Sequence, residues 1–258
     1  MGQKRKKILL LGGTSEASQL VHCLQNNDSI EVIFSLAGVT KNPVLPRNVI
    51  SRVGGFGGVT GLIMWLKNNQ IDFLIDATHP FALQMTNNAW KAAKICRIPF
   101  LNLQRPAWQK RDGDHWYEVN SIPEAVKVLG HRTLRVFLTI GRKDILLFKE
   151  NIIQHHYWIR SVDKPDDTVL PSHAEVITAR GPFDVQSEYD FLKQYHIERI
   201  VTKNSGGQTV YAKIDAARKL SIPVIMIQRP VMPQLPSVST MDKAYQWLMS
   251  RLQGLIRL

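Results

Sequence analysis

Short apolar runs alternate with longer amphipathic segments along nearly the whole chain. The apolar runs predict strands near residues 7–13, 31–38, 48–55, 71–78 and 99–105, and again near 134–141, 157–162, 174–181, 198–207 and 223–230. The segments between them predict helices near residues 15–27, 61–69, 82–96, 121–130, 184–195, 209–220 and 239–252. Continuous apolar strands separated by helices are typical of parallel sheets covered on both faces. The pattern predicts an α/β fold of two consecutive Rossmann-like, doubly wound domains with mainly parallel sheets and a cleft between them.

The boundary between the two domains is weakly marked. Residues 109–119 interrupt the alternation, and the next predicted helix ends at Gly130. We therefore expect a first domain over residues 1–130 and a second, contributing to the substrate cleft, over residues 131–258.

The composition is that of a globular protein with a strongly basic charge. Of 258 residues, 44% are apolar and 21% charged, and 33 Lys and Arg stand against 21 Asp and Glu, a net charge of +12. This excess favours a polyanionic partner, namely nucleic acid, a phosphorylated cofactor or a polycarboxylate, although a basic surface that serves only solubility stays open as an alternative. The aromatic residues are scattered, which argues against nucleic acid. No apolar run is long enough to span a membrane.

The two cysteines, Cys23 and Cys96, stand far apart and form no metal-binding motif. We therefore expect no metal and no disulfide, and a reducing, cytoplasmic location. The adjacent histidines of "HHYW", residues 155–158, fall in a predicted strand and would point to opposite faces, so they are poor metal partners.

In the first half, polar residues follow the carboxyl ends of the predicted strands. Parallel sheets bind their ligands at these ends. "GGTSE" after the first strand combines two glycines with a helix-capping hydroxyl, which suits a phosphate, although a tight turn alone would also use glycines. The candidate cofactor-binding residues are Gly12, Gly13, Thr14, Ser15 and Glu16, then Ser35 and Gly38, then Arg52, Gly55, Phe56 and Gly57, and finally Thr78, His79 and Pro80.

The second strand indicates which dinucleotide would bind. NAD-binding domains commonly end this strand in Asp or Glu for the ribose hydroxyls. Here "FSLAG" has Ser35 and no carboxylate, and Lys41, Arg47 and Arg52 follow. This combination favours NADP or NADPH, so the domain over residues 1–130 is predicted to bind NADP.

Cations and hydroxyls recur at three strand ends of the second half. "TIGR", "TARG" and "TKNSGG" interrupt an otherwise apolar setting, and we expect them to line a site for an anionic substrate rather than to form ordinary solvated loops. The candidate substrate-binding residues are Thr139, Gly141, Arg142, Arg180, Gly181, Lys203, Asn204, Ser205 and Gly206.

Taken together, these motifs resemble a known family. "LLLGGTSEA", "GGFGG", "DATHPFA", "RPAW", "TIGR", "ITARGPF", "VTKNSGG" and "IPVIMIQRP" recur in order between residues 8 and 230 as in the precorrin-6A reductases of cobalamin biosynthesis. The resemblance implies NADPH-dependent reduction of one carbon–carbon double bond of precorrin-6A, a polycarboxylate tetrapyrrole-derived ring, to precorrin-6B. One position departs from the family, which often has an arginine where this chain has Ser18, so that Arg52 or Lys41 would have to supply the phosphate contact.

The resemblance also implies that the cofactor carries the redox chemistry, without metal or flavin. His79 and Lys203 are the candidate catalytic residues, as proton donors in competition with bound water. Two other functions stay open: another NADP-dependent dehydrogenase on this fold, and a non-enzymatic nucleotide- or RNA-binding basic protein. We expect a monomer or weak homo-oligomer, with neither nucleic acid nor a membrane as partner.

Overall fold

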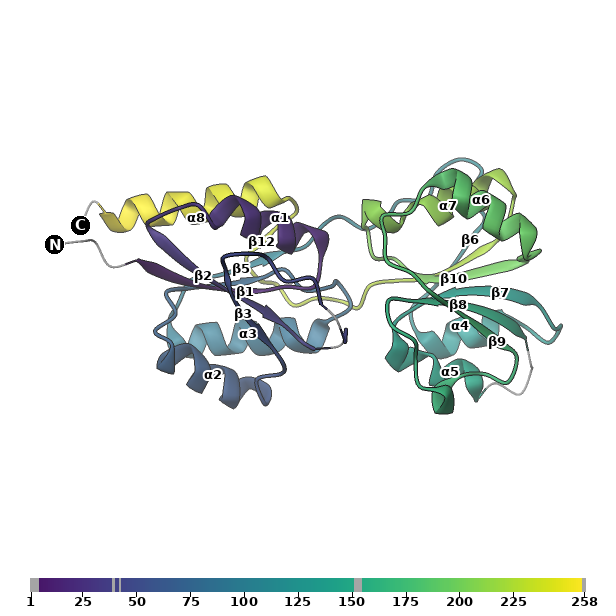
Figure 1. The fold of residues 1–258 in the computed structure, drawn as a ribbon, viewed down its shortest axis with the longest axis horizontal. Helices are drawn as coiled ribbons and strands as arrows, with labels where there is room; N and C mark the ends of the chain where they lie inside the picture. Colours follow the sequence, from purple (N-terminus) through teal and green to yellow (C-terminus); the bar gives the residue numbers. More distant parts are fainter. Residues whose placement is uncertain (1–4, 39, 42, 151–154, 257–258) are drawn as a thin grey trace. The chain divides into compact units, whose positions relative to one another are not determined.

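Two parallel sheets organise the chain in the computed structural model, which describes residues 5–38, 40–41, 43–150 and 155–256 (Figure 1). Each sheet has six strands within these residues, and all of their pairings are parallel. The chain divides into one unit of Met1–Pro106 with Val231–Leu258, and a second unit of Ala107–Pro230. The expected α/β class and the parallel, doubly wound sheets are confirmed.

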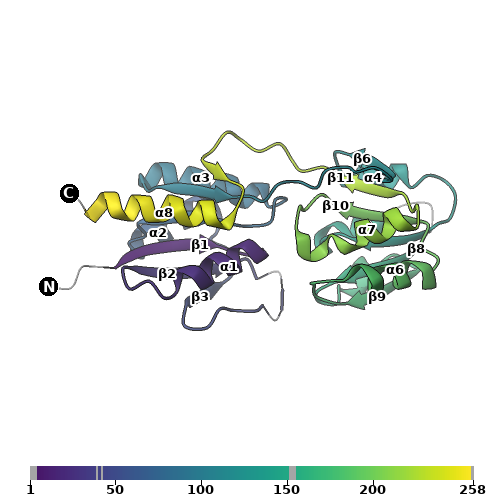
Figure 2. The same cartoon turned by 90° about the horizontal axis from the view of Figure 1, so that it is seen from above.

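The first unit has the strand order β12-β5-β4-β1-β2-β3. Its strands are β1 (Lys6–Leu11), β2 (Ile30–Leu36), β3 (Ile50–Val53), β4 (Phe73–Asp76), β5 (Phe100–Leu103) and β12 (Ser237–Val238). Helices α1 (Ser15–Leu24) and α8 (Met241–Ile256) cover one face of the sheet, and α2 (Gly58–Asn68) and α3 (Leu83–Cys96) cover the other (Figure 1). Seen from above, α8 and α1 lie in front of this sheet (Figure 2).

The apolar run of β1 follows from its central place in this sheet. Ile8 and Leu10 pack in the cluster under α1 and α8, while Leu9 and Leu11 pack in the cluster under α2 and α3. Successive side chains of a strand point to opposite faces, so a strand with both faces covered must be apolar throughout.

The second unit has the strand order β6-β11-β10-β7-β8-β9. Its strands are β6 (Trp116–Val119), β7 (Arg135–Thr139), β8 (His156–Ser161), β9 (Ala174–Thr178), β10 (Arg199–Lys203) and β11 (Val224–Ile227). Helices α6 (Val185–Gln194) and α7 (Ala212–Lys219) cover one face, and α4 (Ile122–Val128) and α5 (Leu146–Lys149) the other (Figure 1). Short 3-10 helices η1 (Arg142–Asp144), η2 (Asp167–Val169) and η3 (Gln208–Val210) lie in its connections.

Both sheets reverse their strand order at one place. In the first unit the reversal lies between β1 and β4, and in the second between β7 and β10. Ligands of open parallel sheets bind outside the carboxyl ends of the strands at such a reversal. Each unit therefore has one preferred ligand position, marked by the loops that follow these strands.

The expected division at Gly130 differs from the observed one. The chain leaves the first unit after Pro106 and returns to it at Val231, so the units are not consecutive. The segment around β6, expected in the first domain, pairs with β11. The C-terminal segment, expected in the second domain, adds β12 beside β5 and packs α8 against α1. In the first unit the sixth strand, β12, follows the other five strands in the chain, and in the second unit the sixth strand, β6, precedes them. Local periodicity reveals neither pairing.

Candidate functional site

The turn after β1 leaves its backbone open to a ligand. Gly12 donates its N–H to the Ser35 carbonyl at 2.8 Å, and a Cβ on Gly12 would lie 2.2 Å from a ring carbon of Phe34. Gly13 has φ +124°, a conformation that L side chains rarely adopt, and a Cβ there would meet nothing within 4 Å. Glycine is therefore required at both positions, by close packing at Gly12 and by conformation at Gly13.

Thr14 joins this turn to the end of β4. It is the N-cap of α1, where its Oγ1 accepts from Ala17 N at 3.2 Å. The same hydroxyl donates to the Ala77 carbonyl at 2.9 Å. One threonine therefore fixes the two loops on either side of the strand reversal, where open parallel sheets bind their ligands.

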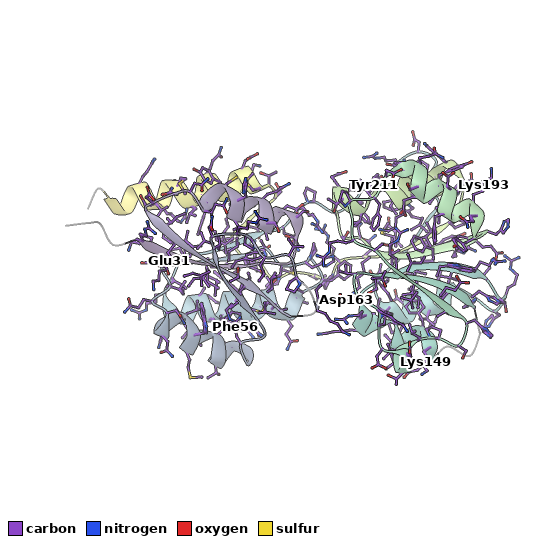
Figure 3. The ribbon with its side chains drawn as sticks, viewed as in Figure 1. Glu31, Phe56, Lys149, Asp163, Lys193 and Tyr211 are labelled. Carbon is purple, nitrogen blue, oxygen red and sulfur yellow. The ribbon has the colours of Figure 1, made fainter. Side chains whose placement is uncertain are left out.

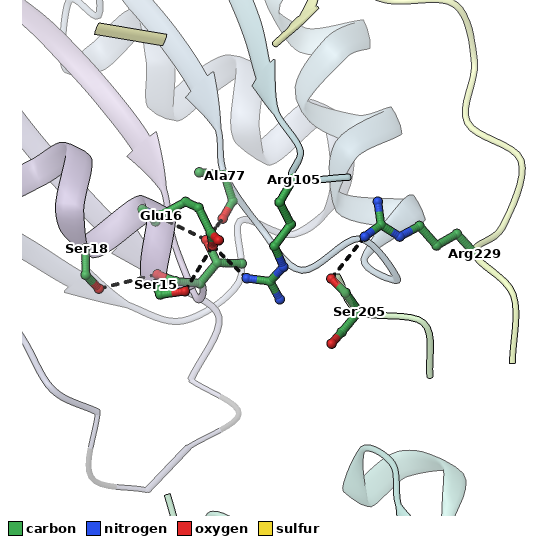
Figure 4. A network of polar contacts seen from close by, with 9 residues as sticks. Ser15, Glu16, Ser18, Ala77, Arg105, Ser205 and Arg229 are labelled. Atoms are coloured by element: carbon green, nitrogen blue, oxygen red, sulfur yellow. Dashed lines mark hydrogen bonds and ion pairs between the residues drawn. The ribbon is translucent and has the colours of Figure 1, made fainter. Parts of the chain in front are cut away.

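Glu16 pairs with an arginine that the sequence reasoning did not select. Arg105, just beyond β5, places its Nη1 2.6 Å from Glu16 Oε2, and Ser15 Oγ donates to the same oxygen at 3.1 Å (Figure 4). The side chains of Arg105 and Glu16 are 12% and 21% exposed. A cation two positions past a strand end, inside the quoted "RPAW" motif, was the signal available for Arg105.

Arg52 lies beside Ser35 at the ends of β3 and β2. The two residues are partners in the strand register, and Arg52 Nη1 donates to Ser35 Oγ at 2.8 Å. The guanidinium also donates to the carbonyls of Gly54 and Gly55, each at 3.0 Å, and its Cζ lies 3.8 Å from the ring centroid of Phe56 (labelled in Figure 3). Partial burial lowers the Arg52 pKa from its ordinary value. A fixed cation therefore stands where NAD-binding domains place a carboxylate.

The remaining candidates of this unit shape the loops around Arg52 and Thr14. Gly57 has φ +75° and is the N-cap of α2, so it ends the glycine-rich loop after β3. Gly38 lies in the loop after β2, and a Cβ there would be 3.3 Å from Val53.

Asp76, at the end of β4, is fully buried and organises the loop that follows. Its Oδ1 accepts from Thr78 N at 3.0 Å and Thr78 Oγ1 at 2.7 Å, and its Oδ2 accepts from Asn102 Nδ2 at 3.2 Å. Burial raises the Asp76 pKa, and these hydrogen bonds with one from Thr86 oppose the rise.

His79 follows in the same loop as an oriented imidazole. Its Nδ1 lies 3.3 Å from the Phe81 N–H and accepts from it, so the neutral ring carries its proton on Nε2. Pro80 is buried, and α3 begins at Leu83, one residue after the start that the sequence pattern predicts.

In the second unit, Lys203 pairs with Asp144 across the strand reversal. Lys203 ends β10 and Asp144 lies in η1 after β7, with 2.5 Å between Lys203 Nζ and Asp144 Oδ2. A Cβ on Gly141 would lie 3.5 Å from that Oδ2 and 4.0 Å from that Nζ, so the ion pair rests against this glycine. Thr139 Oγ1 donates to the Val201 carbonyl at 3.4 Å. Asp144 was missed, although it closes the "TIGRKD" run.

Asn204 serves the scaffold of the loop that follows β10. Its Oδ1 accepts from Trp108 N at 2.7 Å and its Nδ2 donates to Trp108 O at 3.0 Å. Arg229 donates to the carbonyl of Asn204 at 2.9 Å. It also donates to the carbonyl of Ser205 at 3.0 Å (Figure 4). Asn204 was expected to bind substrate, but both polar atoms of its side-chain amide form hydrogen bonds within the unit. Gly206 has φ +72° and completes the turn toward η3.

The two arginines expected beside Lys203 are not equivalent. Arg142 opens η1, directly at the strand reversal, and is half-buried. Arg180 is exposed after β9, the edge strand, with β8 between β9 and β7. Gly181 packs close to Thr209, because a Cβ on it would lie 2.9 Å from the Thr209 carbonyl oxygen. The structure therefore groups Arg142, but not Arg180, with Lys203.

A buried charged cluster lies deeper in the same unit, under α6 and α7. Arg160 Nη1 lies 2.5 Å from Glu188 Oε1, and Lys213 Nζ donates to the Val210 carbonyl at 2.8 Å. Desolvation lowers the pKa of Lys213 to about 8, Glu188 opposes the shift, and Arg160 adds to it. The motif reasoning did not single out Lys213. Tyr211, labelled in Figure 3, precedes it at the start of α7.

The described residues offer neither a metal centre nor a membrane-spanning helix. No group of three or more His, Cys, Asp and Glu side chains there is placed to hold a metal ion. His155 of the "HHYW" stretch is buried just before β8, where its Nδ1 accepts from Leu134 N at 3.2 Å, and burial lowers its pKa. No helix in the described ranges has the length and apolarity needed to cross a membrane.

Comparison with known proteins finds one family over nearly the whole chain. Residues 7–249 match the family described as precorrin-6x reductase CbiJ/CobK. The chain is 42% identical over 236 residues to a precorrin-6A reductase of Rhodococcus erythropolis, covering 92% of this chain and 93% of that one. It is 43% identical over 241 residues to a precorrin-6A reductase of a Sinorhizobium species, covering 93% and 92%. A solved structure described as CobK precorrin-6A reductase superposes with a TM-score of 0.89 at 39% identity, covering 95% and 96%.

Proposed function

Because the chain belongs to the precorrin-6x reductase CbiJ/CobK family, we propose that it reduces one carbon–carbon double bond of precorrin-6A with NADPH, giving precorrin-6B. The named relatives are precorrin-6A reductases, and the match extends over both units. The two relatives at 42% and 43% identity are named precorrin-6A reductases, whereas relatives named cobalt-precorrin-6A reductases share only 25–27% identity, so the ring that we propose as substrate is the metal-free one.

The choice of NADPH rests on the contact between Arg52 and Ser35. A carboxylate at the end of β2 would accept hydrogen bonds from the ribose of NAD and would repel the extra phosphate of NADPH. The hydrogen-bonded Arg52 at this place supports the opposite preference. The open glycine turn and the N-terminus of α1 fit the pyrophosphate.

In this proposal the bound NADPH supplies the hydride, and the protein positions the ring and balances its charge. Lys203 and Arg142 hold ring carboxylates at the strand reversal of the second unit. Arg180 contributes to substrate binding from the loop after β9, at the edge of the sheet. Asp144 Oδ2 lies 2.5 Å from Lys203 Nζ and offsets part of its positive charge. His79, whose Nδ1 accepts from the Phe81 amide, is the candidate for exchanging a proton with the ring, in competition with Lys203 and with water.

The decisive experiment follows NADPH oxidation with and without precorrin-6A. We expect oxidation only when the ring is present, and a product two hydrogens heavier by mass spectrometry. A dehydrogenase with another substrate would bind NADPH and leave precorrin-6A unchanged. A non-enzymatic nucleotide- or RNA-binding protein would oxidise no NADPH with any ring. Cobalt-precorrin-6A in parallel tests the metal-free preference, which equal turnover of both rings would contradict.

The setting of the reaction belongs to the same proposal. We expect a monomer or weak homo-oligomer in the reducing cytoplasm. Sedimentation at several protein concentrations measures the assembly state, and a tight dimer would contradict it.

A further inference from the structure

Glu16 presents a physical conflict at the turn assigned above to the pyrophosphate. It lies in the first turn of α1, two residues after the N-cap Thr14. Negative side chains are favourable at a helix N-terminus, but a second anion at the same place is repelled. A glutamate here should therefore oppose the binding of a dinucleotide unless another group offsets its charge.

Arg105 is that group. It reaches Glu16 from the end of β5, with Nη1 2.6 Å from Oε2, and both side chains are largely shielded from water. The Gln104 N–H donates to the Val238 carbonyl at 2.9 Å, which anchors the backbone next to Arg105 to β12. The arginine therefore comes from a fixed part of the sheet, and its pairing with Glu16 is partly protected from solvent screening.

The nearby position 18 offers no positive charge of its own. Ser18 lies in α1, and its Oγ donates to the Thr14 carbonyl at 3.4 Å (Figure 4). Arg105 stands 89 residues away from Glu16 in the chain, yet the sheet order β5-β4-β1 brings the two loops together.

We propose that Arg105 is a positioning residue that neutralises Glu16 and thereby makes the N-terminus of α1 able to accept the pyrophosphate of NADPH. The proposal rests on the proposed function, since it takes the "GGTSE" turn as the pyrophosphate site. The neutral pair, rather than an arginine–phosphate bond, is the feature that matters. The helix amides then supply the hydrogen bonds to the phosphate.

The test compares NADPH affinity in R105Q, E16Q and the double variant R105Q/E16Q by calorimetric titration. R105Q should weaken binding about tenfold, because it leaves the Glu16 carboxylate unneutralised. E16Q should bind more tightly than wild type, because Arg105 keeps its charge and the glutamine can still accept from it. The double variant should return to within about twofold of wild type.

Rescue by the second substitution separates the alternatives. If Arg105 contacts the phosphate directly, the double variant stays as weak as R105Q, and the proposal is overturned. If the ion pair only supports the fold, all three variants lose thermal stability and keep wild-type NADPH affinity, which also overturns it. R105K retains the charge, so its NADPH affinity should remain close to that of wild type. It serves as the control for the possibility that R105Q binds weakly only because it is misfolded. Added salt should weaken NADPH binding less in R105Q than in wild type, because it screens the new repulsion.

A separate pair of variants shows whether the turn binds the pyrophosphate at all. G13D and G13N impose the same side-chain shape and backbone strain, and they differ in charge. G13D should bind NADPH about tenfold more weakly than G13N. Equal affinities of these two would contradict the site assignment in the proposed function. A difference between them, with R105Q unchanged from wild type, would overturn the role of Arg105 alone.

Discussion

The side-chain amide of Asn204 holds both main-chain polar groups of Trp108, a residue 96 positions earlier in the chain. Asn204 Oδ1 accepts from Trp108 N at 2.7 Å and Nδ2 donates to Trp108 O at 3.0 Å, and both residues are buried. These bonds tie the loop after β10 to the segment that leads into β6. They give the "TKNSGG" motif a structural reason for its asparagine.

N204A should therefore lower the free energy of unfolding. Two buried main-chain groups of Trp108 would lose their partners, at about 1–3 kcal/mol each, so we expect a loss of about 2–6 kcal/mol in urea unfolding. NADPH affinity should stay at the wild-type value, because the cofactor is assigned to the other unit. A loss below about 1 kcal/mol would contradict the role given to these bonds.

Cofactor preference should depend on Arg52. Wild type should bind NADPH at least about tenfold more tightly than NADH, a difference of about 1.4 kcal/mol. R52A should remove most of that preference by weakening NADPH alone, because only NADPH has the additional phosphate. Titration of both dinucleotides into both proteins measures the effect. Equal affinities in wild type would contradict the preference, and an equal loss for both dinucleotides in R52A would show that Arg52 only holds the loop.

The sequence predicted the parts of the fold whose cause is local. The run Ile8–Leu11 indicated a strand buried on both faces, and both faces of β1 are covered. The segment of β6 was not predicted, because its four residues have only their ends buried and follow a charged stretch. Its place in the sheet depends on β11, about a hundred residues further on, so no local pattern reveals it.

The candidate site was predictable to a similar extent. Strand-end glycines and cations could be found because ligand loops follow the carboxyl ends of parallel strands. The partners of those cations could not be found this way. Asp144 lies 59 positions before Lys203, and Glu16 lies 89 before Arg105, so each pair depends on which strands are neighbours.

Replacement of Lys203 should weaken the binding of precorrin-6A and leave the binding of NADPH nearly unchanged. Charge-assisted bonds to a carboxylate contribute about 1.5–3 kcal/mol, so K203A should weaken precorrin-6A binding by roughly ten- to a hundredfold. NADPH affinity should be nearly unchanged. Salt should weaken substrate binding more in wild type than in K203A, because the variant lacks one screened ion pair. Both dissociation constants and the single-turnover rate should be measured on each protein.

Two other outcomes for K203A have distinct meanings. Lost turnover with intact substrate affinity would make Lys203 the proton donor. Lost NADPH affinity with normal substrate binding would mean that the two ligands are assigned to the wrong units. D144N is the matched variant, since it removes the charge that faces Lys203 and keeps the side-chain shape. It should bind the polycarboxylate ring more tightly than wild type, and weaker binding would indicate that Asp144 is needed to orient Lys203.

Lys213 should give the unfolding free energy a specific dependence on pH. Its pKa in the folded protein is lowered to about 8 by desolvation, against an ordinary value of 10.5. Between these values the unfolded chain keeps the proton that the folded protein has released, so stability should rise with pH across this window. A shift of this size corresponds to about 3 kcal/mol at most. Glu188 opposes the release of the proton, and Arg160 favours it.

K213M isolates this contribution, because other lysines and tyrosines also titrate above pH 8. The unfolding free energy of wild type minus that of K213M should increase from pH 8 to pH 10.5, as the folded protein ceases to hold a buried charge. K219M is the matched control, since Lys219 ends the same helix and is exposed to solvent. It should leave the pH profile of wild type unchanged. A difference between wild type and K213M that stays constant with pH would show that Lys213 remains protonated in the folded protein throughout this range.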